Sequence, residues 1–206
     1  MIIGVLLVLA FLVPYTIGWS WGWWKFALSA LLILLLWRWA KPATFRGDLG
    51  LRLGMTDLFM GGLAFLVVGL AASLVIPGIL RPHGYTASLQ CDRIWKYLAV
   101  PFQTLNEEMV LRAFLLTGLA HFMRVGLPAS IGVAVLFTGL HFLLYRFGPP
   151  HIGLSLQALI TLLLVGVACN EFFLATGSIA IPYGVHLGWN LTRFGNGCQI
   201  SRPFPS

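Results

Sequence analysis

The stretch "NEEMVLRAFLL", residues 106–116, places two adjacent glutamates and an arginine inside a long apolar segment. The chain has only six acidic residues in all, so this pair is a third of its acidic side chains. A charged side chain in a membrane-spanning helix costs at least about 2–3 kcal/mol, and such residues tend to face the bundle interior and pair there. We therefore expect Glu107, Glu108 and Arg112 to lie inside a helix bundle and to have partners or a function.

The composition of the whole chain supports this setting. It is 59% hydrophobic and 9% charged, whereas an average soluble domain has about 25% charged residues. A helix needs about 20 largely apolar residues to cross a bilayer. The sequence predicts an all-α fold, a polytopic transmembrane helix bundle of about seven spanning helices, in a single integral membrane domain over residues 1–206. The predicted spans are 1–17, 22–39, 57–79, 97–123, 128–145, 154–171 and 178–193.

The net charge of +7 raises the question of nucleic-acid binding. The basic residues, however, are spread over the predicted loops and helix ends, a distribution that suits lipid headgroups. Trp-rich segments such as "WSWGWW" (19–24) and "WRWA" (37–40) are typical of membrane interfaces. The sequence therefore predicts the lipid bilayer as a partner and no nucleic acid.

Helical spacing gives the two glutamates different surroundings. Glu108 and Arg112 are four residues apart, so they share a helix face and can form an ion pair. Glu107 lies about 100° further round the helix and is expected to point elsewhere, where it could act as a base. The alternative is a buried ion cluster that only fixes the packing of the helices.

Two later predicted helices carry further polar pairs. "FTGLH" (137–141) places Phe137 and His141 on one face, and "HLGWN" (186–190) does the same for His186 and Asn190. Counted from the same membrane face, Glu107 lies about 15 Å deep, His141 about 6–8 Å and His186 about 10 Å. The sequence therefore predicts that all three helices contribute to one buried site.

The order EExxxR, FxxxH and HxxxN on separate helices resembles the CPBP (CAAX protease and bacteriocin-processing, or Abi) intramembrane endopeptidases, over about residues 95–195. The resemblance implies that Glu107 is a general base and that His141 helps it to hold a water molecule. It also implies that His186 and Asn190 donate hydrogen bonds to the oxyanion. The structural and orienting residues in this reading are Glu108, Arg112 and Phe137.

The same resemblance implies cleavage of a membrane-tethered protein or peptide, in maturation or C-terminal sorting, by a multi-pass protein of the bacterial inner membrane. A glutamate-activated water needs no cofactor, whereas a zinc site would use Glu107, His141 and His186 as ligands. The protease motifs HExxH, GxGD and GxSG do not occur in the chain. Two other functions stay open, a proton-coupled transporter with a Glu–His relay and a non-catalytic immunity or scaffold protein.

Overall fold

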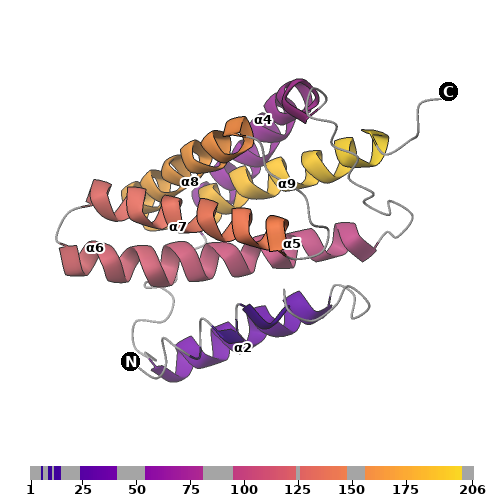
Figure 1. Cartoon of the computed structure of the whole chain (residues 1–206). Coiled ribbons are helices and arrows are strands. Elements are labelled where there is room, and N and C mark those ends of the chain that lie inside the picture. The colour runs from indigo at the N-terminus through magenta and orange to yellow at the C-terminus, as the bar shows by residue number, and fades with distance from the viewer. Residues whose placement is uncertain are drawn as a thin grey trace, which may run out of the picture.

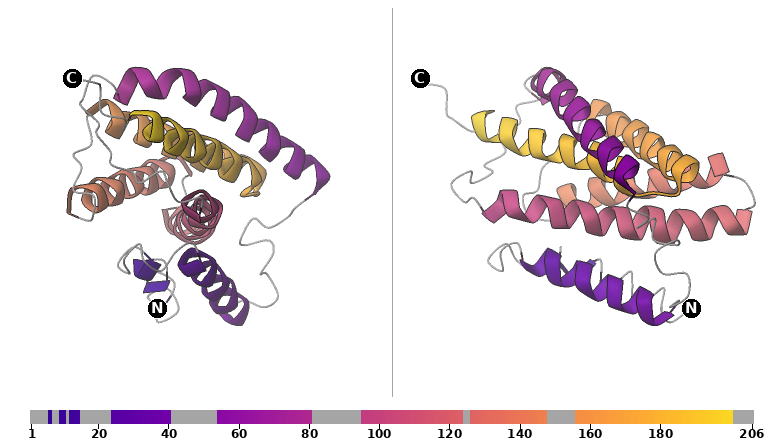
Figure 2. Two further views of the ribbon diagram at one scale, coloured as in Figure 1. Left: turned by 90° about the vertical axis from the view of Figure 1, so that its right-hand side faces the viewer. Right: turned by 180° about the vertical axis from the view of Figure 1, so that it is seen from behind.

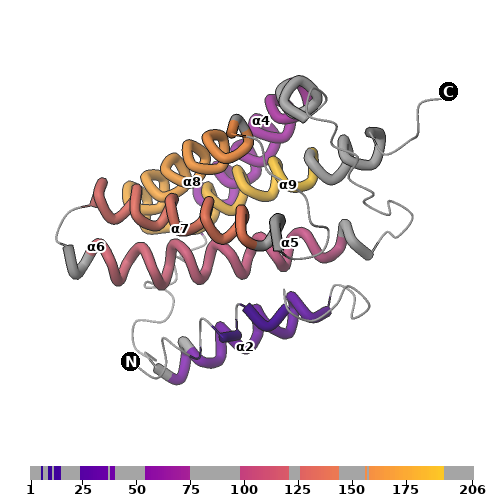
Figure 3. Tube along the Cα trace, viewed as in Figure 1, coloured from indigo at the N-terminus to yellow at the C-terminus, as the bar shows by residue number. Residues whose placement is uncertain are grey.

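A computed structural model describes residues 6, 9–10, 12–14, 24–40, 54–80, 95–123, 126–147 and 156–200 of the chain. The long elements in these ranges are all helical, as Figure 3 traces them. The predicted all-α fold is confirmed, and most helix ends lie within two residues of the predicted spans. The last two helices end at residues 176 and 200, five and seven residues further on than predicted. The predicted first span, 1–17, lies largely outside the described residues. The elements are α2 (Trp24–Ala40), α4 (Met55–Leu80), α5 (Trp95–Glu108), the π-helix η3 (Met109–Leu116), α6 (Thr117–Met123), α7 (Gly126–Phe147), α8 (Leu156–Thr176) and α9 (Ala180–Ile200).

Three of the described helices contain a segment that is long and apolar enough to cross a membrane: Met55–Leu74, Gly126–Leu143 and Ala158–Thr176. Trp24–Leu36 is a shorter apolar helix. Large apolar side chains are exposed along the outer faces of these helices, where a lipid bilayer would cover them. The chain is thus an integral membrane helix bundle. Examples of the exposed side chains are Leu35, Phe59, Leu74, Leu143 and Leu164.

One long helix, made of α5, η3 and α6 in succession, runs through the middle of the bundle. Figure 1 shows α2 on one side of it and the remaining helices on the other, and the end-on view in Figure 2 shows neighbours around it. Asn106, Glu107 and Glu108 are consecutive and all buried. Successive residues of a helix point about 100° apart, so these three can be buried together only because several helices surround this one. Asn106 contacts α2, where its Nδ2 donates to the carbonyl of Phe26 at 3.0 Å.

The winding of this central helix changes directly after the glutamate pair. Residues Met109–Leu116 form a π-helix, a rare and wider winding that is found mostly at functional sites. The carbonyl oxygen of Arg112 accepts from the backbone N–H of Thr117 and also from its hydroxyl, the latter at 3.2 Å. Thr117 therefore supplies two hydrogen bonds to the carbonyl oxygen of Arg112 within this wider winding. The change of winding lies next to the charged residues.

Helix α9 is held against α4 by small residues. A Cβ atom on Gly184 would overlap the carbonyl oxygen of Gly61, and one on Gly188 would lie 2.5 Å from the carbonyl oxygen of Phe65. Gly184 and Gly188 are four residues apart, so they form one glycine face on which two membrane helices can approach closely. His186 lies between these glycines in sequence and projects from the opposite side of α9. The close α4–α9 contact therefore directs His186 toward the central helix.

Substituting Gly184 by alanine is expected to weaken this contact. The added methyl group meets backbone of α4, which cannot move aside as a flexible side chain would, and overpacking of this kind costs about 1–3 kcal/mol. Gly62→Ala is the matched control, because a Cβ atom there has no neighbour within 4 Å. Thermal unfolding of the two variants in lipid nanodiscs measures the difference. Equal melting temperatures would show that the glycine face does not hold α9 in place.

Candidate active site

The centre of the site is the carboxylate of Glu108. One of its oxygens, Oε1, accepts from Nη1 of Arg112 at 2.9 Å and contacts Nδ1 of His186 at 2.8 Å. The ion pair between Glu108 and Arg112, predicted from their spacing, is confirmed. His186 comes from α9 and joins this pair from across the helix interface. All three side chains are buried.

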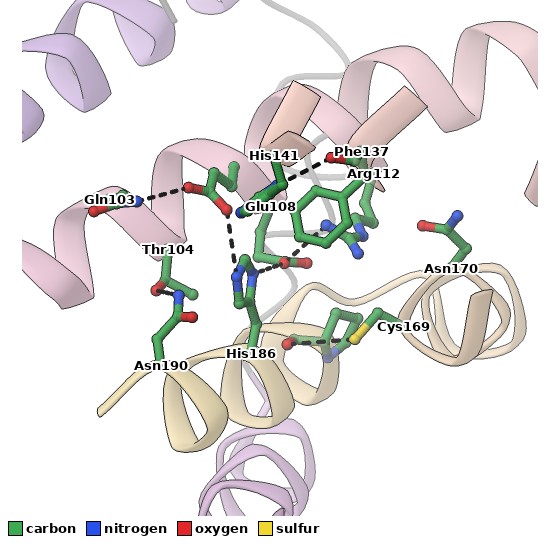
Figure 4. A network of polar contacts seen from close by, with 12 residues as sticks. Gln103, Thr104, Glu108, Arg112, Phe137, His141, Cys169, Asn170, His186 and Asn190 are labelled. Atoms are coloured by element: carbon green, nitrogen blue, oxygen red, sulfur yellow. Dashed lines mark hydrogen bonds and ion pairs between the residues drawn. The ribbon is translucent and has the colours of Figure 1, made fainter. Parts of the chain in front are cut away.

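Glu107, which helical spacing leaves free to point elsewhere, has contacts of its own, and one of them leads back to the pair through His186. Its Oε1 accepts a hydrogen bond from Nε2 of Gln103 at 3.0 Å, and its Oε2 lies 3.3 Å from Nε2 of His186. The two glutamates are adjacent on α5, so their side chains leave the helix about 100° apart. A single imidazole nevertheless reaches both carboxylates, because its two nitrogens are on opposite sides of the ring. Figure 4 shows His186 reaching from α9 toward Glu108 on the central helix.

These contacts bring four ionisable side chains into one buried cluster, which we name the carboxylate–imidazole cluster: Glu107, Glu108, Arg112 and His186. Their exposed fractions are 2%, 0%, 1% and 4%. Arg112 brings a permanent positive charge to this cluster, and both nitrogens of His186 face carboxylate oxygens. Charged groups can be buried away from water when they are paired with one another.

Phe137 connects the second predicted motif to this cluster. Its ring lies 4.3 Å from that of His141, between ring centres, and meets the ring of His186 edge-on at 5.6 Å. The guanidinium of Arg112 lies over the same ring at 5.3 Å, a cation–π geometry. His141 is further fixed through Nδ1, which lies 3.0 Å from the carbonyl oxygen of Phe137. Phe137 therefore joins α7 to the cluster and supports the orienting role predicted for it.

The last predicted residue, Asn190, lies one turn beyond His186 on α9. Its Nδ2 donates to the hydroxyl oxygen of Thr104 at 3.2 Å. Thr104 and Gln103 are neighbours on α5, and the sequence reasoning overlooked both. The available signal was their position: each is polar within a predicted span, and Gln103 precedes Glu107 by four residues, on the same helix face.

Comparison with known proteins places this site in a family. Residues 92–192 match the type II CAAX prenyl endopeptidase Rce1-like family. This region belongs to the CAAX protease family. The matched range contains all three motifs and ends just beyond Asn190, so the predicted resemblance is confirmed. The family indicates an intramembrane endopeptidase. No curated protein and no solved structure gives a match to the chain.

The zinc alternative can be compared with the arrangement of this site. Nδ1 of His186 lies 2.8 Å from Oε1 of Glu108, and its Nε2 lies 3.3 Å from Oε2 of Glu107. Among the residues that the structure describes, no three His, Cys, Asp or Glu side chains are gathered as a possible metal site.

A small pocket borders the carboxylate–imidazole cluster. It has room for about one water molecule. Within the described residues, Oε2 of Glu108 and Nε of Arg112 are buried and have no hydrogen-bond partner, and buried water commonly satisfies such groups. The lining combines three side chains of the site with mostly apolar ones of α8 and α9. It consists of Arg112, Phe137, Thr161, Leu162, Val165, Cys169, His186 and Trp189.

Removing the cation of the buried pair is expected to destabilise the protein strongly. Arg112→Met leaves Glu108 buried with one cationic partner fewer, and breaking a buried ion pair in this way costs about 3–5 kcal/mol. In the double variant Arg112→Met/Glu108→Gln the loss is expected to be smaller than the sum of the two single losses. Unfolding free energies of the three variants in detergent test this coupling. Strictly additive losses would contradict it.

Proposed function

We propose that the chain is a glutamate-dependent endopeptidase that hydrolyses a peptide bond of a membrane-tethered protein or peptide. The observation that carries this proposal is the bridging of His186 between two buried carboxylates within the family-matched region. It supports different roles for Glu107 and Glu108, because their contacts with His186 differ in length. The nitrogen–oxygen distance to Glu108 is 2.8 Å, whereas the distance to Glu107 is 3.3 Å. The looser contact at Glu107 is the one that a water molecule can open.

In this mechanism Glu107 removes a proton from a water molecule held between it and His141. The resulting hydroxide attacks the carbonyl carbon of the scissile bond, and a tetrahedral oxyanion forms. His186 and Asn190 donate hydrogen bonds to that oxyanion, each worth roughly 3 kcal/mol in a site from which water is excluded. The carbon–nitrogen bond then breaks, and Glu107 returns its proton to the leaving amine.

Glu108 and Arg112 have a different task in this proposal. Glu108 binds the Nδ1 side of His186, and Arg112 binds the same carboxylate oxygen. A carboxylate on one side of an imidazole fixes the ring and determines what its other nitrogen can donate, as in the hydrolase triads. Two neighbouring glutamates thereby take separate roles, one as base and one as anchor.

The proposed substrate reaches the site from the membrane. The cluster is buried within helices whose outer faces are apolar, so a lipid-anchored chain segment is better placed to enter than a freely soluble protein. The description of the matched family names prenyl endopeptidases, and a prenylated C-terminal peptide is therefore the first probe to use. The bacterial inner membrane stays a prediction from the sequence.

The base role predicts loss of cleavage in Glu107→Gln without loss of the fold. Removal of a general base lowers rates by about 100- to 10,000-fold, and the glutamine keeps the shape of the side chain. Purified protein in nanodiscs is incubated with a farnesylated peptide ending in Cys-aliphatic-aliphatic-X, and mass spectrometry identifies the products. Glu171→Gln is the control, because Glu171 is an exposed glutamate on α8. Equal cleavage by Glu107→Gln and Glu171→Gln would exclude Glu107 as the base.

Metal removal gives a separate test of the same proposal. In a glutamate mechanism the bound water is activated by a carboxylate, so treatment with EDTA and 1,10-phenanthroline is expected to leave the cleavage rate unchanged. Metal content is measured by mass spectrometry before and after treatment. A rate that falls with the metal content and returns with added zinc would favour a metalloprotease.

A further inference from the structure

Gln103 lies four residues before Glu107 on α5, and its side chain reaches the proposed base directly. Nε2 of Gln103 donates to Oε1 of Glu107 at 3.0 Å. The other oxygen of that carboxylate, Oε2, lies 3.3 Å from Nε2 of His186. The two oxygens of Glu107 therefore have different partners, one an amide and the other an imidazole. Figure 4 shows Gln103 on the central helix and His186 on α9, the two helices from which these partners come.

The two glutamates accept hydrogen bonds from donors of different chemistry on the central helix. Glu108 is bound by Arg112, which carries a permanent positive charge. The donor on Glu107 from the same helix is the neutral amide of Gln103, at the same four-residue spacing but on the N-terminal side. A neutral donor fixes the direction of a carboxylate and opposes its protonation less than a full positive charge does. That combination suits a base that must gain and release a proton during each turnover.

We propose that Gln103 is a positioning residue that holds Glu107 in the orientation needed for proton transfer, with Oε1 on the amide and Oε2 toward the reacting water. This inference rests on the proposed function of Glu107. The same turn of α5 holds a second member of the site, because Thr104 accepts from the amide of Asn190 at 3.2 Å. The segment before the glutamate pair thus contacts both the proposed base, Glu107, and a proposed oxyanion donor, Asn190.

The test uses the near-isosteric variant Gln103→Glu. At low pH its protonated carboxyl can still donate to Oε1 of Glu107, whereas at high pH two carboxylates oppose each other at hydrogen-bonding distance. Cleavage of the farnesylated peptide is therefore expected to be retained at acidic pH and to fall at alkaline pH, with the pH optimum lowered by about one unit or more. Gln103→Met, which has similar volume and no donor, is expected to be slow at every pH.

Asn170→Asp is the matched control. Asn170 is also a buried amide, but its Nδ2 donates to the backbone carbonyl of Ser130 at 2.7 Å rather than to a glutamate. This variant places a new carboxyl group in the bundle away from Glu107, so the pH optimum is expected to stay where it is. The proposal is overturned if Gln103→Glu keeps the wild-type profile, or if Asn170→Asp moves the optimum as far.

A stability measurement separates this inference from the function on which it rests. Relative to wild type, Gln103→Glu is expected to lose melting temperature as the pH rises, because the folded state favours the proton shared by residues 103 and 107. That extra loss is expected to disappear in Gln103→Glu/Glu107→Gln, where one carboxyl is gone. If wild type and Glu107→Gln are equally inactive on the peptide, the proposed function fails, and with it the positioning role. If the pH-dependent loss of melting temperature persists in the double variant, the side chains of residues 103 and 107 do not contact each other.

Discussion

The burial of two adjacent glutamates and an arginine in the centre of a membrane helix bundle is the constraint on which the rest of the structure depends. An uncompensated buried charge costs several kcal/mol. Arg112 forms an ion pair with Glu108, and His186 contacts both carboxylates at once. Because that imidazole belongs to α9, the charges of the central helix require the His186 face of α9 to lie against them.

The other helices are arranged in agreement with this requirement. The glycine face of α9 rests on backbone of α4, and this close approach leaves the opposite face of α9 for His186 and Asn190. Phe137 brings α7 against both histidines and the arginine. On the far side of the central helix, Asn106 binds a backbone carbonyl of α2. Packing and chemistry are thus determined by the same few residues, and a substitution at the cluster affects both.

The helical fold, the Glu108–Arg112 pair and the joining of the EExxxR and HxxxN helices could be predicted from the sequence, because apolar length and helical spacing are local properties. The partner of Glu107 could not, since it depends on the rotation of α9, which the α4 contact sets. The π-helix after Glu108 has no signal in the sequence that we recognise. Gln103 and Thr104 carried a usable signal, because a polar side chain one turn before a buried carboxylate is placed to bind it.

The most direct test of the central claim, that Glu107 acts in peptide-bond hydrolysis, is a comparison of membrane-protein termini in cells. Cells carrying wild type or Glu107→Gln, at equal protein levels, are analysed by terminal proteomics. We expect specific new termini with wild type that are missing with the variant, and these termini would also identify the substrate. Identical termini in the two strains, with the variant still rescuing any phenotype of the deletion strain, would show that Glu107 only holds the bundle together.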